Sequence, residues 1–321
     1  MAKIFITDLD HVSIEVEKSV LDPSGIPYEW VQCRTEDAVI EKCQGATALM
    51  IQYAPITEKV IAALPELKIV VRYGVGVNNI DIDAATKHGV LVCNVPDYGF
   101  EEVANHTVAL MYALTRKIVL MNNHTKTVGW DYSPSLPIYR YSEQTVGVVG
   151  VGRIGQAFAE KMHAIGFNVI ATDDYAVKIG IPIPDYIKMV SIDELIKTSD
   201  IISVHCPLEF SKDLIGDAEF KQMKPNVFIL NTSRGGIINE EALDRALEQK
   251  LIAGAGFDVM VKEPADLSHP LFRHENFLCT PHMAWYSEEA SLELKRKTAE
   301  EAVNFTLGKP VRYALNKPVA K

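Results

Sequence analysis

The sequence predicts an α/β protein built from two doubly wound domains, each with a parallel β-sheet. The chain has 321 residues, which is enough for two domains that each bury a core of their own. Short runs rich in β-branched residues alternate with helical patterns almost throughout. Because these runs are continuously apolar, they are typical of parallel strands that helices cover on both faces.

The first series of elements occupies residues 1–99. Five strands are predicted there, at 3–8, 27–33, 46–52, 67–74 and 90–95. Helical patterns lie between several of them, at 36–43, 57–67 and 82–89. A long helix is then predicted over 101–122, and the segment 129–144, which contains prolines and tyrosines, is interpreted as an ordered loop or linker.

A second series begins at Thr145. Its predicted strands lie at 145–150, 167–172, 200–206, 226–233, 252–259 and 275–281. A last helix, about 287–307, is free to return to the first domain. We therefore expect residues 1–99 and 290–321 to form one domain and residues 100–289 to form the other.

Charge and composition narrow the possible partners. The net charge of −10 argues against a broad nucleic-acid surface. No apolar run approaches the ~20 residues of a membrane helix, and the N-terminus has a strand pattern instead of a leader. Five cysteines without CxxC spacing predict buried thiols and no metal site. We expect a cytoplasmic protein that binds neither membrane nor nucleic acid, with no regulatory domain after Lys321.

A glycine motif follows the strand at 145–150. Gly150, Gly152 and Gly155 form G-x-G-x-x-G between an apolar strand and an amphipathic helix. Gly150 permits a tight turn, Gly152 lets the backbone approach a pyrophosphate, and Gly155 lets the helix pack closely on the strand. The N–H groups of Arg153 and Ile154, at the positive end of the helix, are expected to bind the pyrophosphate.

The next strand ends at Asp173, 18 residues after Gly155. Its carboxylate is placed to accept hydrogen bonds from the adenosine ribose hydroxyls. Asp173 and Asp174 together would repel a 2′-phosphate, so the sequence favours NAD over NADP.

Three polar residues follow successive strands of the second domain. Arg234 follows the strand at 226–233, Glu263 follows 252–259, and His282 follows 275–281. Parallel strands bring their carboxyl ends to one edge of a sheet, so we expect the three near the nucleotide. Hydride transfer at carbon needs a proton on the adjoining oxygen, which suits His. A carboxylate beside the ring stabilises the imidazolium, and an Arg fork can hold a substrate carboxylate.

In these motifs the chain resembles the D-isomer-specific 2-hydroxyacid dehydrogenase family. The resemblance covers nearly the whole sequence, through VVRYGVGVNNIDI, GVVGVGRIGQAFA, LNTSRGGIINEEAL, GFDVMVKEP and TPHMAWYSEEA. It implies a Rossmann NAD-binding domain inserted in a flavodoxin-like substrate-binding domain. It also implies that Arg234, Glu263 and His282 are the catalytic residues.

The resemblance implies further site residues. Asp258 matches an acid that contacts the nicotinamide carboxamide. Other positions are expected to line the cofactor, at Thr107, Cys206, Pro207, Thr232 and Ser233. The expected substrate residues are Tyr53, Arg72, Gly74, Val75, Gly76 and Trp285, with the N–H groups of Val75 and Gly76 receiving the substrate carboxylate.

Within the family, the motifs are most similar to the C-terminal-binding-protein branch and to short phosphoglycerate dehydrogenases. Animal-type phosphoglycerate enzymes commonly have Arg where this chain has Gln52, which argues against a phosphorylated substrate. Formate dehydrogenases carry Gln where this chain has Glu263 and are disfavoured. Trp285 has two interpretations, a wall of the substrate pocket or packing between domains.

Two functions remain open. The first is an NAD-dependent oxidoreductase that interconverts a 2-keto acid and a D-2-hydroxy acid, with His282 as acid/base. The alternative is an NADH-sensing scaffold, similar to the corepressors of the resembling branch, which binds short peptide motifs. The apolar stretch at 108–114 and the pairing of related enzymes through this region favour a homodimer.

Overall fold

The computed structural model describes residues 2–318, and the chain divides into two compact units. Unit 1 comprises residues 1–99 and 287–321, and unit 2 comprises residues 100–286. The second crossing falls before the expected 289/290 because Ser287 caps the last helix. The Ser287 hydroxyl accepts a hydrogen bond from the Ala290 N–H at 3.0 Å, so the whole of this helix belongs to unit 1.

Unit 1 contains a five-stranded parallel sheet in the order β2-β1-β3-β4-β5. The strands are β1 (Ile4–Ile6), β2 (Tyr28–Trp30), β3 (Ala48–Ile51), β4 (Ile69–Arg72) and β5 (Leu91–Cys93). The helices are α1 (Glu15–Ser24), α2 (Glu36–Lys42), α3 (Glu58–Ala63), α4 (Ile82–Lys87) and α12 (Glu288–Thr306). Apolar side chains of α2, α3 and α4 pack on one face of the sheet, while α1 and α12 pack together and α12 contacts β3 and β4.

Unit 2 contains a seven-stranded parallel sheet in the order β12-β11-β10-β9-β6-β7-β8. The strands are β6 (Thr145–Val149), β7 (Asn168–Thr172), β8 (Ile187–Met189), β9 (Ile201–Val204), β10 (Phe228–Asn231), β11 (Gly254–Phe257) and β12 (Phe277–Cys279). The α-helices are α5 (Phe100–Thr115), α6 (Ile118–Thr127), α7 (Arg153–Ile165), α8 (Asp174–Ile179), α9 (Ile192–Thr198), α10 (Asp217–Phe220) and α11 (Glu240–Glu248). Short 3₁₀ turns lie at Ser133–Ser135, Tyr141–Glu143, Leu208–Phe210 and Pro270–Arg273.

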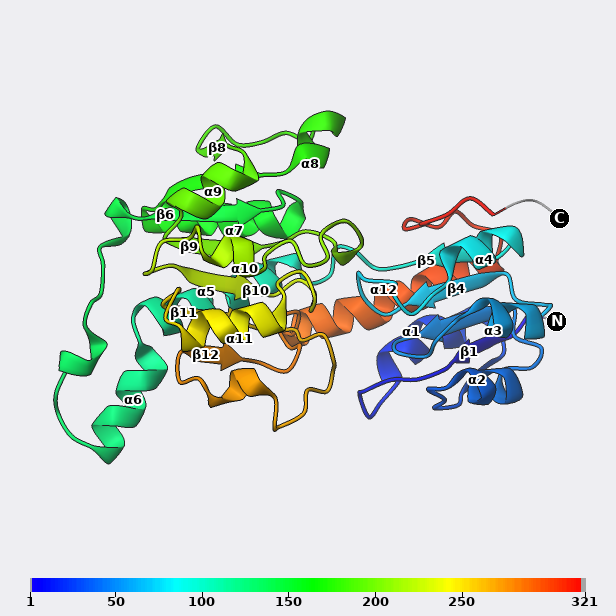
Figure 1. Ribbon diagram of the computed structural model, residues 1–321. Helices are drawn as coiled ribbons and strands as arrows, with labels where there is room; N and C mark the ends of the chain where they lie inside the picture. The colour runs from blue at the N-terminus through cyan, green and yellow to red at the C-terminus, as the bar shows by residue number, and fades with distance from the viewer. Residues whose placement is uncertain (1, 319–321) are drawn as a thin grey trace. The chain divides into compact units, whose positions relative to one another are not determined.

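Both faces of the unit 2 sheet are covered, as its apolar strands predict (Figure 1). One core contains side chains of α5 and α7, including the fully buried Phe158. The other contains side chains of α9 and α11, including Leu195 and Leu243. The predicted fold class of two parallel-sheet α/β domains is confirmed.

One predicted element differs from the structure, and one short strand was missed. The helix expected over 101–122 is two helices, because α5 ends at Thr115 and Lys117 adopts left-handed backbone angles (φ 53°) before α6. The N–H of Lys117 donates to the Leu114 carbonyl at 3.0 Å, which tightens and closes the last turn of α5. The short strand β8 was not predicted, because three residues give too little pattern for a strand.

Within residues 2–318, no helix is long and apolar enough to span a bilayer. The five cysteines are free thiols, and Cys33, Cys43 and Cys93 are buried. No group of three or more His, Cys, Asp or Glu side chains is placed to hold a metal in this described part of the chain.

The left-handed residue between α5 and α6 gives a stability prediction. A non-glycine residue in this conformation costs about 1–2 kcal/mol. Lys117→Gly should therefore raise the free energy of unfolding of unit 2 by roughly 0.5–1 kcal/mol, and its thermal midpoint should rise accordingly. The matched control is Ala113→Gly inside α5, which should lower the free energy of unfolding by roughly 1 kcal/mol and so lower the midpoint. Calorimetry measures the thermal midpoints of the wild type and of both variants. Equal losses of stability in both variants would mean that α5 continues through residue 117 in solution.

Candidate active site

The site residues of unit 2 gather at the carboxyl edge of its sheet. The strand order reverses at β6, which lies between β7 and β9, and open α/β sheets bind ligands at such a point. Six of the loops that leave this edge carry predicted site residues. They contain Gly150 after β6, Asp173 after β7, Cys206 after β9, Arg234 after β10, Glu263 after β11 and His282 after β12.

The glycine loop has the shape that a dinucleotide requires. Gly150 has φ +94°, and a Cβ on Gly155 would collide with the Gly150 carbonyl, so α7 packs directly on the loop. Gly152 occupies the N-cap of α7 and has no side chain to accept the first-turn N–H groups. Among the described residues, no heavy atom lies within 4 Å of the position a Gly152 Cβ would take. The loop and the 13-residue helix therefore fit a pyrophosphate.

Arg153 and Ile154 open α7, as predicted. Asp173 follows β7 and is the N-cap of α8, where one carboxylate oxygen accepts the Ala176 N–H at 2.8 Å. Its other oxygen accepts the Val151 N–H at 2.9 Å. The carboxylate therefore braces the glycine loop, and each oxygen retains acceptor capacity for a ribose hydroxyl.

The remaining predicted cofactor residues are tied to one another. The hydroxyls of Thr107 on α5 and Thr232 after β10 lie 2.7 Å apart, and both residues are buried. The Ser233 hydroxyl donates to the Cys206 carbonyl at 2.9 Å, and Pro207 follows directly. These bonds tie the end of β10 to α5 and to the end of β9.

The three residues expected to be catalytic lie on neighbouring loops. His282 Nδ1 is 2.6 Å from Glu263 Oε2, and Glu263 Oε1 accepts the Met260 N–H at 2.9 Å. Burial acts to raise the pKa of Glu263, but its hydrogen bond and charge interaction with His282, the Met260 N–H and the charge of Arg234 lower it overall. With Glu263 ionised, Nδ1 of the ring carries the hydrogen, so Nε2 is left to exchange a proton. Arg234 Nη1 donates to the Ser233 carbonyl at 2.6 Å.

The turn that carries His282 is held by Asp258. His282 has left-handed backbone angles (φ 53°), which a histidine adopts only where the surroundings impose them. The buried Asp258 carboxylate accepts hydrogen bonds from the Thr280 hydroxyl and from the N–H groups of Met283 and Ala284, at 2.5, 3.0 and 2.8 Å. The His282 N–H donates to the Asp258 carbonyl at 2.8 Å. Asp258 is 1% exposed, and its carboxylate also lies 3.7 Å from His106 Nε2 on α5.

Trp285 lies three residues after His282 on the same segment. It is half-buried and contacts Tyr286 edge to face, with ring centroids 5.6 Å apart. Both rings belong to unit 2.

The other predicted substrate residues gather at the carboxyl edge of the unit 1 sheet. They are Tyr53, Arg72, Gly74, Val75 and Gly76. The Tyr53 hydroxyl donates to Asp10 at 2.9 Å. Gly74 has φ +123°, and the Arg72 guanidinium fills the space that a side chain at Gly74 would need. Val75 is exposed at the tip of this loop, and its carbonyl accepts the Asn94 amide at 2.7 Å.

A match to a family model identifies the family of this chain. The model for the NAD-binding domain of D-isomer specific 2-hydroxyacid dehydrogenases matches residues 108–284. The chain belongs to this family. The matched NAD-binding domain contains the glycine loop and all three residues of the Arg234–Glu263–His282 trio.

Proteins related to this chain differ in length and in the substrate that their names give. The D-3-phosphoglycerate dehydrogenase of Archaeoglobus fulgidus is 39% identical over 82% of this chain, but the match spans 50% of that longer protein. The glycerate dehydrogenase of Methylorubrum extorquens is 33% identical over 88% of this chain and 91% of its own length. The structure of Escherichia coli D-lactate dehydrogenase is 29% identical, with a TM-score of 0.79 over 98% of this chain and 100% of that chain.

Two supporting carboxylates of the dehydrogenase were not predicted. The fully buried Asp8 accepts the N–H groups of Gln52, Tyr53 and Ala54, and so shapes the loop after β3. Glu240 accepts the Val261 N–H in the loop that carries Glu263. Acidic residues are common at strand ends and helix N-termini, so the sequence alone does not reveal which loop such a residue supports.

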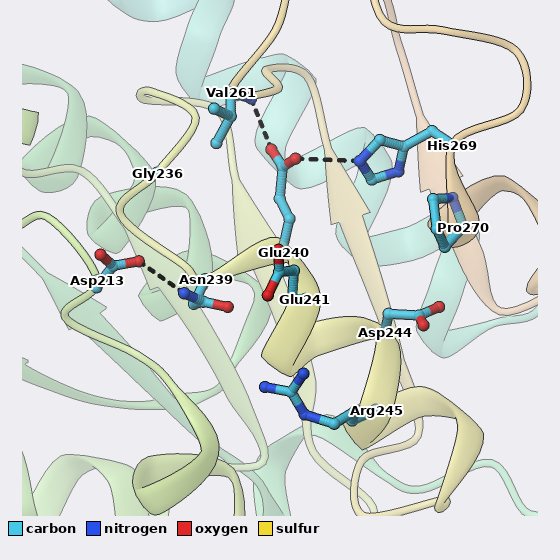
Figure 2. Close-up of a pocket in the computed structure, with 10 residues that line it drawn as sticks. All are labelled: Asp213, Gly236, Asn239, Glu240, Glu241, Asp244, Arg245, Val261, His269 and Pro270. Atoms are coloured by element: carbon cyan, nitrogen blue, oxygen red, sulfur yellow. Dashed lines mark hydrogen bonds and ion pairs between the residues drawn. The ribbon is translucent and has the colours of Figure 1, made fainter.

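Glu240 borders a cavity of about 560 Å³ beside the β11 loop (Figure 2). The residues that line it are Asp213, Gly236, Asn239, Glu240, Glu241, Asp244, Arg245, Val261, His269 and Pro270. The described residues that line it do not include Arg234, Glu263 or His282. The cavity is therefore a neighbour of the catalytic edge and not its reaction site.

Asp173 gives a prediction for cofactor selectivity. Asp173→Ala removes the acceptor for the ribose and the brace on Val151, so the KM for NADH should rise about 10–100-fold, and the preference over NADPH should fall. Asp174→Ala is the matched control, because it removes an exposed carboxylate one residue further on. It should leave the KM for NADH within about threefold. An Asp173→Ala enzyme with unchanged selectivity would show that Asp173 serves only the fold.

Proposed function

We propose that this dehydrogenase interconverts a 2-keto acid and a D-2-hydroxy acid, with His282 as acid/base, Glu263 as its partner and Arg234 as the substrate anchor. The observation that carries the proposal is the 2.6 Å contact between His282 Nδ1 and Glu263 Oε2 at the edge that also carries the glycine loop. NADH, when bound, supplies the hydride that reaches C2 of the keto acid.

His282 supplies the matching proton in reduction. Its Nδ1 is engaged by Glu263, so the proton leaves from Nε2 to the oxygen on C2 as that oxygen gains charge. Glu263 remains ionised because its hydrogen bonds and nearby positive charges outweigh the effect of burial on its pKa. The ionised carboxylate stabilises the imidazolium before transfer and fixes the ring afterwards. Such acid–base catalysis contributes roughly 10²–10⁴-fold.

Arg234 is suited to anchor the acid. One of its Nη groups is fixed on the Ser233 carbonyl, which orients the guanidinium plane and leaves other N–H groups for a carboxylate and the keto oxygen. In unit 1 we assign the N–H groups of Val75 and Gly76 to the substrate carboxylate, as the family resemblance implies.

We infer that the substrate carries no phosphate. Gln52 stands where a cation would be needed, and its amide donates to Asp10 at 2.7 Å. Hydrogen bonds from His11, and further ones from Tyr53 and Gln52, outweigh burial and lower the pKa of Asp10 to about 2. Asp10 is thus a permanent negative charge beside Tyr53, where it would repel a dianionic group. Arg34 nearby is engaged with the Leu9 carbonyl and the Tyr53 ring.

We further propose a cytoplasmic homodimer that pairs through α6 and the segment after it. None of the residues of α6, all of them described, is buried, and the helix stands away from the sheet of unit 2 (Figure 1). Several apolar side chains in this segment are largely exposed. They include Ile118, Val128, Trp130, Tyr132 and Leu136, which are 54–95% exposed. A second copy of the chain would cover this apolar surface.

The reaction is tested with a panel of 2-keto acids and NADH. Glyoxylate, pyruvate, hydroxypyruvate and bulky or aromatic keto acids are compared with 3-phosphohydroxypyruvate. We expect turnover of at least one unphosphorylated acid, at an efficiency about tenfold or more above that of the phosphorylated acid. His282→Ala should lower kcat about 10²–10⁴-fold. Full activity of His282→Ala, or no turnover of any acid, would contradict the proposal.

The oligomer is tested by light scattering after size exclusion. The wild-type protein should have twice the 35.6 kDa chain mass. Trp130→Asp combined with Val128→Asp should shift it to the monomer, because two buried charges would oppose the interface. Leu267→Asp, at an exposed apolar residue outside this segment, is the control and should remain dimeric. A monomeric wild type would refute the dimer.

A further inference from the structure

The loop that carries Glu263 is held by a residue outside the catalytic trio. Glu240 Oε1 accepts the Val261 N–H at 2.6 Å, two residues before Glu263 (Figure 2). The preceding amide, Met260 N–H, donates to Glu263 itself at 2.9 Å. Consecutive N–H groups of one short loop are therefore satisfied by two carboxylates, one of them catalytic.

Glu240 is itself firmly placed. It is the first residue of α11, where the helix dipole favours a carboxylate, and Asn239 caps the helix by accepting the Ala242 N–H at 2.9 Å. The Glu240 side chain is 10% exposed, and its second oxygen lies 3.3 Å from His269 Nε2. His269 Nδ1 accepts the Leu271 N–H, so Nε2 carries the hydrogen that points to Glu240.

The opposite side of the same peptide is also fixed. A Cβ on Gly235 would collide with the Met260 carbonyl, so the loop that follows β10 packs backbone to backbone against Met260 and Val261. The Met260–Val261 peptide is therefore fixed on its carbonyl side by Gly235 and on its N–H side by Glu240. Releasing either contact frees the loop to rotate away from His282.

We propose that Glu240 is a positioning residue for the acid–base pair, which it serves by holding the loop of Glu263 through Val261 N–H. This role rests on the proposed function, in which Glu263 orients His282. The Glu240 carboxylate does not touch the trio. It acts only through the loop backbone.

Several charged and titratable groups lie around Glu240 and Glu263. Glu240 faces His269, and Glu263 faces His282 and Arg234. The Cys279 thiol, on β12, feels the charges of both Glu240 and Glu263. Burial, and then the charges of Asp258, Glu263 and Glu240, raise the pKa of this thiol to about 11, so it stays neutral at physiological pH.

The kinetic test compares Glu240→Ala, Glu240→Met and Glu240→Gln with the control Glu241→Ala. The first two lack an acceptor for Val261 N–H, so kcat should fall about 10–100-fold, while the KM for NADH stays within about twofold. Glu240→Gln keeps an amide oxygen and should retain kcat within about threefold. Glu241→Ala removes an exposed charge from the same helix turn and cavity and should match the wild type.

The pH profile gives a second reading. A loosened loop weakens the hydrogen bonds that lower the pKa of Glu263, so this pKa should return towards its ordinary value of 4.5. The acid limb of kcat/KM should therefore move to higher pH in Glu240→Ala and Glu240→Met, and not in Glu240→Gln or Glu241→Ala. Loss of folding alone would lower the amount of active enzyme without moving this limb.

A readout without turnover separates this inference from the proposed function. The imidazole N–H proton of His282, hydrogen-bonded to Glu263, should give a downfield proton resonance in the wild type, assigned by its loss in His282→Gln. It should be retained in Glu240→Gln and broadened or lost in Glu240→Ala. Unchanged kcat and resonance in Glu240→Ala, or equal losses in Glu240→Gln or Glu241→Ala, would overturn the inference. A wild type that reduces no keto acid but shows the expected resonance pattern would refute only the proposed function.

Discussion

The contact between His282 and Glu263 requires two loops from different strands to meet within 2.6 Å. Neither side chain can achieve this alone, because His282 sits in a left-handed turn and Glu263 lies in a partly exposed loop. The turn is held by the buried Asp258 carboxylate, and the loop by Met260, Gly235 and Glu240. The contact between His282 and Glu263 is therefore the outcome of a supporting layer of hydrogen bonds.

The parallel sheet explains why these groups can meet at all. Parallel strands deliver every carboxyl end to one edge, so β6, β10, β11 and β12 present a phosphate loop, an arginine, a glutamate and a histidine on the same side. The bonds of Thr107 to Thr232 and of Ser233 to Cys206 tie the end of β10 to α5 and to the end of β9. Cofactor binding and proton transfer thus share one rigid frame.

Much of this arrangement is visible in the sequence. The G-x-G-x-x-G spacing and its strand–helix context identify the loop at Gly150, and the order of strands predicts that Arg234, Glu263 and His282 share an edge. The break at Lys117 was missed, because neither Gly nor Pro marks it and a left-handed lysine has no sequence signal. The support from Glu240 was missed because it joins residues 21 apart through a backbone N–H, which any residue could supply.

The substrate is the least visible property, because small differences in side chains at the unit 1 edge separate one keto acid from another. Gln52 and Asp10 illustrate this, since the Gln52 amide donates to the Asp10 carboxylate at 2.7 Å, a contact that no sequence motif marks. Relatives named for phosphoglycerate, glycerate and lactate all match this chain. Membership of the family therefore does not by itself name the acid.

In the proposed reaction His282 protonates the oxygen while hydride reaches one face of C2, and that face fixes the configuration of the product. The most direct measurement is chiral chromatography of the hydroxy acid that forms from a prochiral 2-keto acid and NADH. We expect the D enantiomer only, formed about 10²–10⁴-fold more slowly by His282→Ala. An L product, or a racemic one formed enzymatically, would contradict it.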